Sequence, residues 1–355
     1  MIYRESGQFK TSYAADQAIF PIPQDRIGVL ALLAIAFLAV PVVASEYWMG
    51  AILIPFLILS LAALGLNILT GYCGQLSLGS AAFMAVGAFA AYNLELRAPG
   101  IPLLVNFILA GVCAAGVGVL FGIPSLRIKG FYLAVATLAA QFFIEWALTK
   151  FGWFSNYSPS GVITAQTMVV FGYQVTTTTE KYLLVLAIVA ALALLAKNMV
   201  RSNTGRAWMA VRDMDVAAEV IGIKIMKTKL MAFAISSFYC GVAGALWAFA
   251  YLGTVDAQAF DLQRSFQILF MIIIGGVGSI LGSFLGAAFI ILLPIFLNQG
   301  AHAVFGNAIR PEMLSSLELV VFGALIIFFL IVEPHGLARL WQIAKEKLRL
   351  WPFPH

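Results

Sequence analysis

The sequence contains little charge. Asp, Glu, Lys and Arg make up only 10% of its 355 residues, and 62% of the residues are hydrophobic. A soluble domain carries roughly 25% charged residues, so the 21 Lys and Arg and the 16 Asp and Glu found here are too few to cover a water-facing surface. This shortage excludes a soluble enzyme, a nucleic-acid-binding protein and a disordered chain. It indicates a membrane protein.

Cysteine and histidine are also rare. The three cysteines, Cys73, Cys113 and Cys240, lie within or beside apolar runs, and their number is odd. We therefore expect no disulfide framework and interpret them as small hydrophobic side chains. The three histidines lie in different loops or tails, so we expect no metal site and no cofactor.

Sequence motifs for catalysis are absent. The chain has no Gly-x-x-x-x-Gly-Lys-Ser/Thr phosphate loop, no His-Glu-x-x-His and no Gly-x-Ser-x-Gly. The carboxylates nearest to a membrane interior, Glu145 and Glu318, fall near the ends of apolar runs, where we interpret them as interface residues. We expect a non-catalytic protein, and any ATP hydrolysis would come from another chain.

Long apolar runs make up most of the sequence. A bilayer needs roughly 20 apolar residues per helix and tolerates no unpaired backbone, so these runs predict helices rather than strands. We predict an all-α polytopic membrane protein with about ten transmembrane or re-entrant helices. The predicted segments are Ile27–Ala44, Met49–Leu69, Leu76–Leu94, Ile101–Ile123, Phe131–Leu148, Tyr182–Val200, Leu230–Leu252, Phe266–Val277, Ile280–Leu297 and Leu317–Val332.

The basic residues predict the orientation of these helices. Ten crossings place both chain ends on one side, together with 16 of the 21 Lys and Arg residues. Since Lys and Arg collect on the cytoplasmic side, we predict that both termini are cytoplasmic. We divide the chain into an N-terminal tail (1–26, with no signal-peptide cleavage pattern), a transmembrane domain (27–340) and a C-terminal tail (341–355). The five basic residues on the outer side are Arg97, Lys150, Lys181, Arg264 and Arg310.

Two glycine-interrupted segments, Gly71–Ser80 and Gly275–Ser283, lie in different halves of the chain. Corresponding breaks in two halves are typical of an inverted-repeat transporter whose pathway runs between the halves. The alternative is that these small residues only allow close helix packing. The candidate pathway residues in and near the breaks are Asn67, Gln75, Ser77, Ser80, Gly276, Gly278 and Ser279.

The loop Arg201–Lys229 is long, basic and predicted to be cytoplasmic. We expect one or two short helices outside the bilayer, with Asp213 or Asp215 as an N-cap and Gly222 as a left-handed C-terminal residue. Attraction of the loop to anionic membrane lipid, about 1 kcal/mol per basic residue, explains its lysines. A docking helix for a cytoplasmic partner also explains its acidic residues and its amphipathic stretch.

Several stretches, in order along the chain, resemble the LivM-like permease subunits of branched-chain amino-acid ABC transporters. The resemblance extends from about residue 50 to residue 340. The matching stretches are Gly65–Phe89, Leu126–Leu138, Asn203–Gly222, Lys229–Ala245 and Ile274–Ala287.

This resemblance implies an inner-membrane importer built from two permease chains, two ATP-binding subunits and a periplasmic solute-binding protein. The chain would be one permease beside a LivH-like partner, and would carry branched-chain or related amino acids by alternating access. The alternative is a stand-alone secondary carrier or channel for a small solute such as urea or an amide. The candidate ATPase-coupling residues are Arg206, Arg212, Asp213, Asp215, Glu219 and Gly222.

Overall fold

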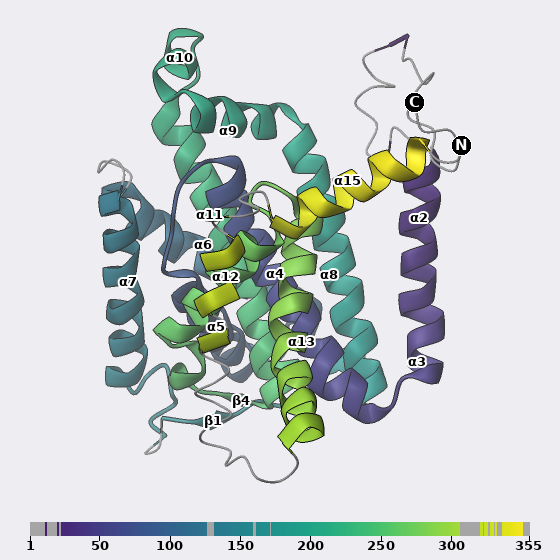
Figure 1. The fold of residues 1–355 in the computed structure, drawn as a ribbon. Helices are drawn as coiled ribbons and strands as arrows, with labels where there is room; N and C mark the ends of the chain where they lie inside the picture. Colours follow the sequence, from purple (N-terminus) through teal and green to yellow (C-terminus); the bar gives the residue numbers. More distant parts are fainter. Residues whose placement is uncertain are drawn as a thin grey trace.

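The structure is a computed structural model of the 355-residue chain. It describes residues 11–12, 20, 23–125, 131–158, 161–170, 172–305, 320–321, 323–325, 327–329, 331 and 336–350. Long helices run side by side through the molecule, with two short helices standing at one end and short strands at the opposite end (Figure 1). Most of the predicted tail 1–26, residues 351–355 of the other tail, and Glu318 lie outside the described residues.

The long helices are often continued by a π-helical turn. Their bounds are α2 Pro23–Ala34 with η1 Ile35–Ala39 and α3 Val40–Val43; η2 Trp48–Leu53 with α4 Ile54–Asn67 and η3 Ile68–Tyr72; α5 Ser80–Arg97; α6 Leu103–Ser125; α7 Phe131–Lys150; α8 Thr178–Arg201; α11 Ile225–Leu246 with η4 Trp247–Leu252; α12 Leu262–Gly275; α13 Ile280–Phe305; and α15 Gly336–Leu350. The short helices are α9 Asn203–Asp213, α10 Asp215–Val220 and the 3-10 helix η5 Ala257–Phe260.

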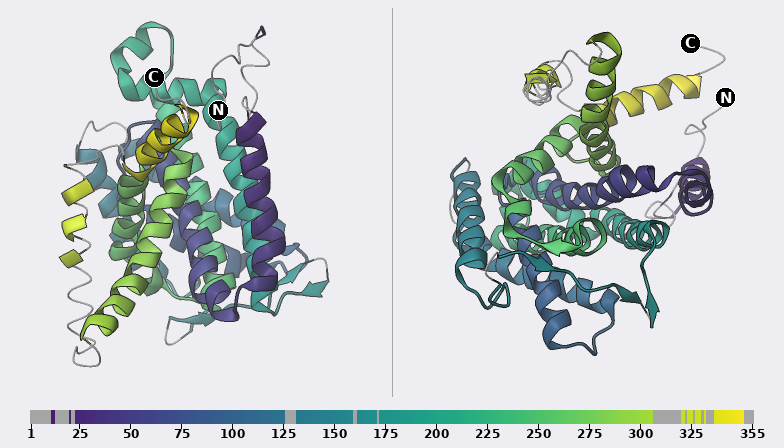
Figure 2. Two further views of the ribbon diagram at one scale, coloured as in Figure 1. Left: turned by 45° about the vertical axis from the view of Figure 1, so that its right-hand side comes forward. Right: turned by 90° about the horizontal axis from the view of Figure 1, so that it is seen from below.

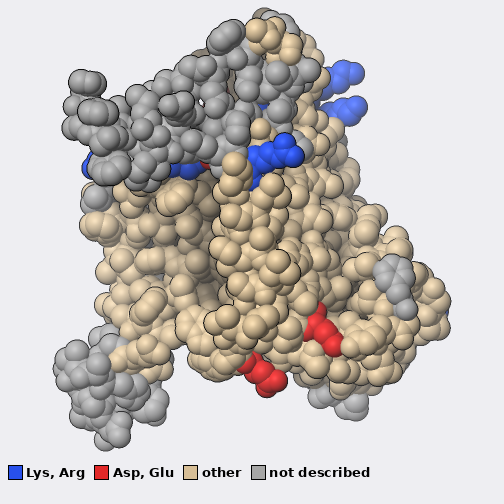
Figure 3. Space-filling model, turned by 90° about the vertical axis from the view of Figure 1, so that its right-hand side faces the viewer, with Lys and Arg blue, Asp and Glu red and all other residues tan. Residues whose placement is uncertain are grey.

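Six of these helical segments are long and apolar enough to cross a bilayer, so the chain is a multi-pass membrane protein. Each coincides with one of the predicted segments. Figure 3 shows a face with Lys and Arg toward one end, Asp and Glu toward the other, and a broad uncharged region between them. The six are Asp25–Val43, Trp48–Tyr72, Leu103–Pro124, Thr178–Arg201, Ile225–Leu252 and Ile280–Gln299.

Of the remaining predicted segments, Phe131–Leu148 lies wholly within α7, and the others are helical in part. The segment predicted from Leu76 becomes helical only at Ser80, and α12 has 14 residues, too few to cross a bilayer alone. The described residues between 320 and 331 are helical, and Phe329 packs edge-to-face on Phe289 of α13 with ring centroids 5.9 Å apart. The predicted domain boundary between residues 340 and 341 falls inside α15.

Two antiparallel strand pairs lie at the end of the molecule opposite α9 (Figure 1). β1 (Ile163–Thr164) pairs with β4 (Thr254–Val255), and β2 (Val169–Val170) pairs with β3 (Tyr173–Gln174). The β1–β4 pair connects the loop after α7 to the chain that follows α11, and the β2–β3 pair is a hairpin within that loop.

The core forms around α4 and α11, which are the most buried of the long helices. α11 packs along α5 and α6 and also against α4, while α4 packs against α13, α8 and α12. Glycines allow this close approach, because a Cβ on Gly65 would lie 2.7 Å from the Cβ of Tyr239. A Cβ on Gly87 would overlap the backbone of Gly241, and one on Gly244 would overlap that of Met84.

The N-terminal helix α2 stands at the edge of the bundle beside α8 (Figure 2). Its span contributes no buried residues, but the Tyr182 hydroxyl donates to the Ala36 carbonyl oxygen at 3.1 Å. Lys345 of α15 forms an ion pair with Asp25 at 2.9 Å. The beginning of α2 and the C-terminal half of α15 therefore meet on the side that carries α9.

We expect Gly87→Leu to lower the free energy of unfolding by about 3 kcal/mol, because the new side chain must push α5 away from Gly241. Gly116→Leu on α6 is the matched control, since a Cβ at Gly116 meets nothing within 4 Å. Thermal unfolding of the purified chain in detergent measures both. Equal midpoints for the two variants would contradict the packing explanation.

Candidate functional site

The first helix break follows η3, which ends at Tyr72. Gly74 takes a positive φ of 71°, a conformation that favours glycine, and the chain is non-helical until α5 begins at Ser80. The break leaves backbone groups without helical partners inside the protein, where each must be satisfied. The amide of Leu78 donates to Thr137 Oγ1 of α7 at 2.9 Å, and the amide of Gln75 donates to the Leu69 carbonyl at 3.0 Å.

The start of α5 is held by side chains of two other helices. The amide of Ala81 donates to Ser265 Oγ of α12 at 2.9 Å, and the amide of Ala82 donates to Gln141 Oε1 of α7 at 2.7 Å. Gln141 is fully buried, accepts from Ser265 Oγ at 3.0 Å and donates to the Phe260 carbonyl at 2.8 Å. The side-chain amide of Gln141 therefore connects the start of α5 to the segment that leads into α12.

The second helix break lies between α12 and α13. Gly276 and Gly278 have φ values of 124° and 80°, which side-chain-bearing residues rarely adopt. The Gly276 amide still donates to the Ile272 carbonyl at 2.9 Å, and Ser279 Oγ accepts from the Gly282 amide at 3.1 Å at the start of α13. Both breaks predicted from the sequence are present.

Asn67 joins the two breaks across 211 residues of sequence. Its side chain is fully buried and donates to the Ser279 carbonyl at 2.8 Å and to Ser283 Oγ at 2.9 Å. It accepts from the Gly278 amide at 2.8 Å. A Cβ on Gly71 would overlap both Asn67 Oδ1 and the Gly278 backbone, so the close approach needs a glycine at this position.

Arg212 of α9 reaches the same place. Its Nη1 donates to the Gly71 carbonyl oxygen at 3.0 Å, and its Nη2 lies 2.8 Å from Asp213 Oδ1. A Cβ on Gly74 would lie 2.9 Å from Arg212 Cγ. The end of η3 leaves backbone carbonyls without helical partners, and a cation is favoured there by the helix dipole. Arg212, a predicted coupling residue, thus contacts the predicted pathway segment Gly71–Ser80. The sequence alone indicates these only as two separate features.

The two short helices are fixed to the bundle. Trp208 is fully buried and its Nε1 donates to the Thr228 carbonyl at 3.2 Å, which anchors α9 on the first turn of α11. The residue preceding α9 is Ser202, whose Oγ accepts from the Thr204 amide at 3.3 Å. Movement of α9 would therefore be transmitted to α11 and, through Arg212, to η3.

The predicted caps are only partly correct. Gly222 has a positive φ of 90°, as expected. The predicted N-cap at Asp213 or Asp215 is wrong, because Met214 occupies the N-cap position of α10 without a side-chain cap. Asp213 pairs with Arg212 instead, and Asp215 lies in the first turn of α10.

The other predicted residues lie nearby without converging on one cavity. Ser77 and Ser80 are buried, and Ser80 Oγ has no hydrogen-bond partner within the described part of the chain. Gln75 is half-buried and donates to the Cys73 carbonyl at 3.3 Å. Arg206 contacts Asn203 of its own helix. Glu219 is exposed on α10, where Met214, Val216, Val220 and Ile221 also expose large apolar side chains.

Comparison with known proteins identifies the family. The family model "Branched-chain amino acid transport system / permease component" matches residues 48–330, which include both breaks and the α9–α10 pair. The chain belongs to this permease family. The resemblance noted from the sequence is thereby confirmed.

Individual relatives agree with this assignment. The LivM permease protein of a high-affinity branched-chain amino acid transport system is 27% identical over 297 residues in both Salmonella typhimurium and Escherichia coli; each match covers 77% of this chain and 66% of the relative. A probable LivM of Methanocaldococcus jannaschii is 25% identical over 243 residues, covering 66% of this chain and 68% of that protein. The chain thus spans about two thirds of the length of these relatives. No solved structure matches it.

Gln141 was missed by the sequence analysis, although a signal was present. It is a polar residue inside the apolar run predicted at Phe131–Leu148, and such residues are costly in a membrane unless they are paired. The glycine-rich segments indicate where the helices break, but they do not indicate which side chains satisfy the backbone groups of the breaks.

We expect Asn67→Ala to lower the free energy of unfolding by about 2–4 kcal/mol, because it leaves the half-buried Gly278 amide and the buried Ser283 hydroxyl without this partner. Ser60→Ala is the control, since buried Ser60 bonds only to carbonyls one turn earlier in its own helix. Thermal unfolding in detergent measures the difference. A loss for Ser60→Ala as large as that for Asn67→Ala would rule out a special role for the junction.

Proposed function

We propose that this chain is the membrane-spanning permease subunit of an ATP-driven importer that carries branched-chain or related amino acids. The observation that carries the proposal is the Arg212–Gly71 hydrogen bond, which connects an exposed helix pair to the meeting point of two helix breaks. Membership of the permease family and the names of the LivM relatives support the substrate class.

We further propose an inverted repeat made of α4–α5–α6 and α11–α12–α13. Reciprocal packing supports it, because α11 packs along α5 and α6 while α4 packs against α12 and α13. In this scheme the segment after α11, Gly253–Asp261, takes the place of the break after η3. This scheme differs from the one predicted from the sequence, in which Gly71–Ser80 and Gly275–Ser283 correspond to each other. Gly275–Ser283 instead lies between α12 and α13.

The proposed topology has about ten transmembrane or re-entrant helices, with both termini on the cytoplasmic side of a bacterial inner membrane. The opposite positions of α9 and of the β1–β4 pair support two distinct membrane faces (Figure 1). Positive residues concentrated before α2, in the α9–α10 region and in α15 support the assignment of the α9 face to the cytoplasm.

In the proposed mechanism, closure of an ATPase pair displaces α9 and α10. Trp208 transmits the displacement to α11, and Arg212 transmits it to η3 and the Asn67–Gly278 junction. The two halves then rock about this junction and open the pathway alternately to each side. The permease itself performs no chemistry, and all free energy comes from the ATPase subunits.

The proposed partners are a LivH-like second permease, two ATP-binding subunits and a periplasmic solute-binding protein. The solute-binding protein selects the amino acid, so the permease pathway needs only weak affinity. A stand-alone carrier or channel is the competing function. Reconstitution of the chain without ATPase subunits separates the two, because gradient-driven flux under those conditions would support the carrier and overturn the importer.

We expect Arg212→Ala to reduce solute uptake at least about tenfold while the complex still assembles, because the loss of a charge-assisted bond of about 2 kcal/mol disconnects α9 from η3. Lys227→Ala removes one positive charge from the first turn of α11, where Lys227 is exposed and outside the proposed coupling residues, so it should retain most uptake. Transport and ATPase rates of the reconstituted complex measure this. Equal losses of uptake for the two variants would indicate that uptake depends on the positive charge of this region and not on the Arg212–Gly71 bond.

We propose that the exposed apolar side chains of Met214, Val216, Val220 and Ile221 dock the ATPase. We expect Val220→Asp to block ATPase association, because Val220 is 83% exposed on α10 and lies among these side chains. The substitution should leave the thermal midpoint of the isolated chain nearly unchanged, within about 0.5 kcal/mol, since the side chain packs against nothing. Co-purification of the ATPase with the permease is the measurement. Full association would show that α10 is not the docking surface.

A further inference from the structure

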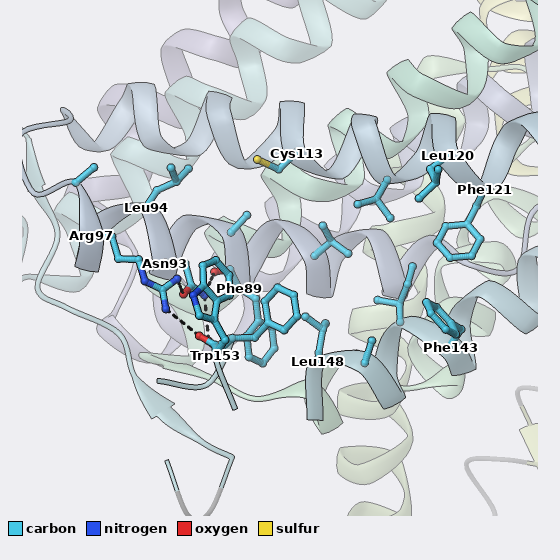
Figure 4. A pocket seen from close by; sticks show the side chains of 17 residues that line it. Phe89, Asn93, Leu94, Arg97, Cys113, Leu120, Phe121, Phe143, Leu148 and Trp153 are labelled. Carbon is cyan, nitrogen blue, oxygen red and sulfur yellow. Dashed lines mark hydrogen bonds between the residues drawn. The ribbon is translucent and has the colours of Figure 1, made fainter. Parts of the chain in front are cut away.

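A cavity of about 520 Å³ lies between α5, α6, α7 and the segment that follows α7. It is separate from the two helix breaks and from every residue proposed above for coupling. α6 packs closely on α5 but makes few contacts with α7, which leaves the space between them open. Figure 4 shows the side chains that enclose it, and the hydrophobic ones include Val86, Phe89, Val117, Phe121, Phe143 and Leu148.

The cavity opens sideways onto the uncharged surface of the bundle. Leu120 and Phe143 line it and are 67% and 53% exposed. In a multi-pass membrane protein this surface faces the lipid acyl chains. The cavity is thus accessible from within the bilayer.

One end of the cavity carries a positive charge. Arg97, in the last turn of α5, lies with its guanidinium 3.6 Å from the centroid of the Trp153 ring and donates to the Trp153 carbonyl at 2.9 Å. It also donates to Asn93 Oδ1, and Asn93 in turn donates to the Phe154 carbonyl at 3.0 Å. In the described part of the chain the ion pairs are Arg212–Asp213 and Lys345–Asp25, so Arg97 lies at this end of the cavity without a carboxylate within ion-pair distance.

The length of the cavity matches one leaflet. The lining extends along α5 from Val86 to Arg97, which corresponds to about 16 Å at the rise of an α-helix. Half of a bilayer hydrocarbon core is about 15 Å thick. Arg97 lies at the end of the molecule opposite α9, so an occupant with its head at Arg97 would extend its tail to about the middle of the membrane.

We propose that this cavity binds an acyl chain of an anionic phospholipid from the leaflet opposite α9, with the phosphate at Arg97. An amino acid fits the site poorly, because its ammonium group needs an acceptor and no carboxylate lines the cavity. A phospholipid matches both the apolar walls and the single cationic end. The inference rests on the membrane setting of the chain and does not depend on the proposed import function.

Native mass spectrometry of the purified full chain, titrated with phosphatidylglycerol or phosphatidylcholine, tests the proposal. We expect Arg97→Ala to weaken phosphatidylglycerol binding about fivefold, the effect of one basic residue on an anionic headgroup, and to weaken phosphatidylcholine binding less, because the choline ammonium offsets the charge of its phosphate. Lys150→Ala removes another cation from the same end of the molecule outside the cavity lining, and it should bind both lipids as the unmodified chain does.

A second pair of variants tests the walls. Val117→Phe fills the cavity and should reduce binding of both lipids, whereas Val112→Phe makes the same change on an exposed part of α6 outside the lining and should not. Equal binding of the two lipids by the unmodified chain would overturn the role of Arg97. Unchanged lipid binding by both Arg97→Ala and Val117→Phe, with thermal midpoints matching the controls, would overturn the site.

Discussion

The arrangement of this protein depends on the satisfaction of backbone groups where helices are broken inside a membrane protein. Lipid offers no hydrogen-bonding partner, so each interruption needs donors and acceptors from elsewhere in the chain. Asn67 of α4 supplies hydrogen-bonding groups to the second break. Gln141 of α7 supplies them to the start of α5 and to the segment leading into α12. Because these partners belong to different helices, each bond also fixes the relative position of two elements. The cost of breaking a helix is therefore offset by contacts that determine how the two halves of the bundle meet.

Glycine contributes to this arrangement in two distinct ways. At Gly74, Gly276 and Gly278 the backbone has a positive φ, so the residue is required by conformation. At Gly71 and Gly87 it is required by space, because an added Cβ would overlap a neighbouring segment. Close packing and hydrogen bonding at the breaks are therefore not exclusive here. The glycines that let helices approach closely also bring the polar groups of the breaks within hydrogen-bonding distance.

Local features of the fold were predictable from the sequence, whereas the contacts between distant segments were not. Apolar runs located the six bilayer-length helices, and glycine runs located both breaks. The start of α5 was predicted four residues early, because hydropathy does not register that the Leu78 amide is taken by Thr137. The predicted N-cap at Asp213 or Asp215 was wrong because Asp213 pairs with Arg212, which also donates to the Gly71 carbonyl, and because α10 begins at Asp215 with Met214 as its N-cap. No sequence spacing indicates that Asn67 bonds to a residue 211 positions away.

The chemistry of the Arg212 contact suits a part that must move. A guanidinium bonded to a neutral carbonyl oxygen is stabilised by about 1.5–3 kcal/mol, and Asp213 beside it keeps the cation paired when the bond breaks. A buried carboxylate in place of the Gly71 carbonyl would bind the arginine more tightly, and separating the two charges would then cost about 3–5 kcal/mol. In the proposed permease that cost would hold η3 against α9 in one state. In the proposed mechanism, a backbone oxygen at a helix end instead gives a contact that would transmit displacement and be released and re-formed in each transport cycle.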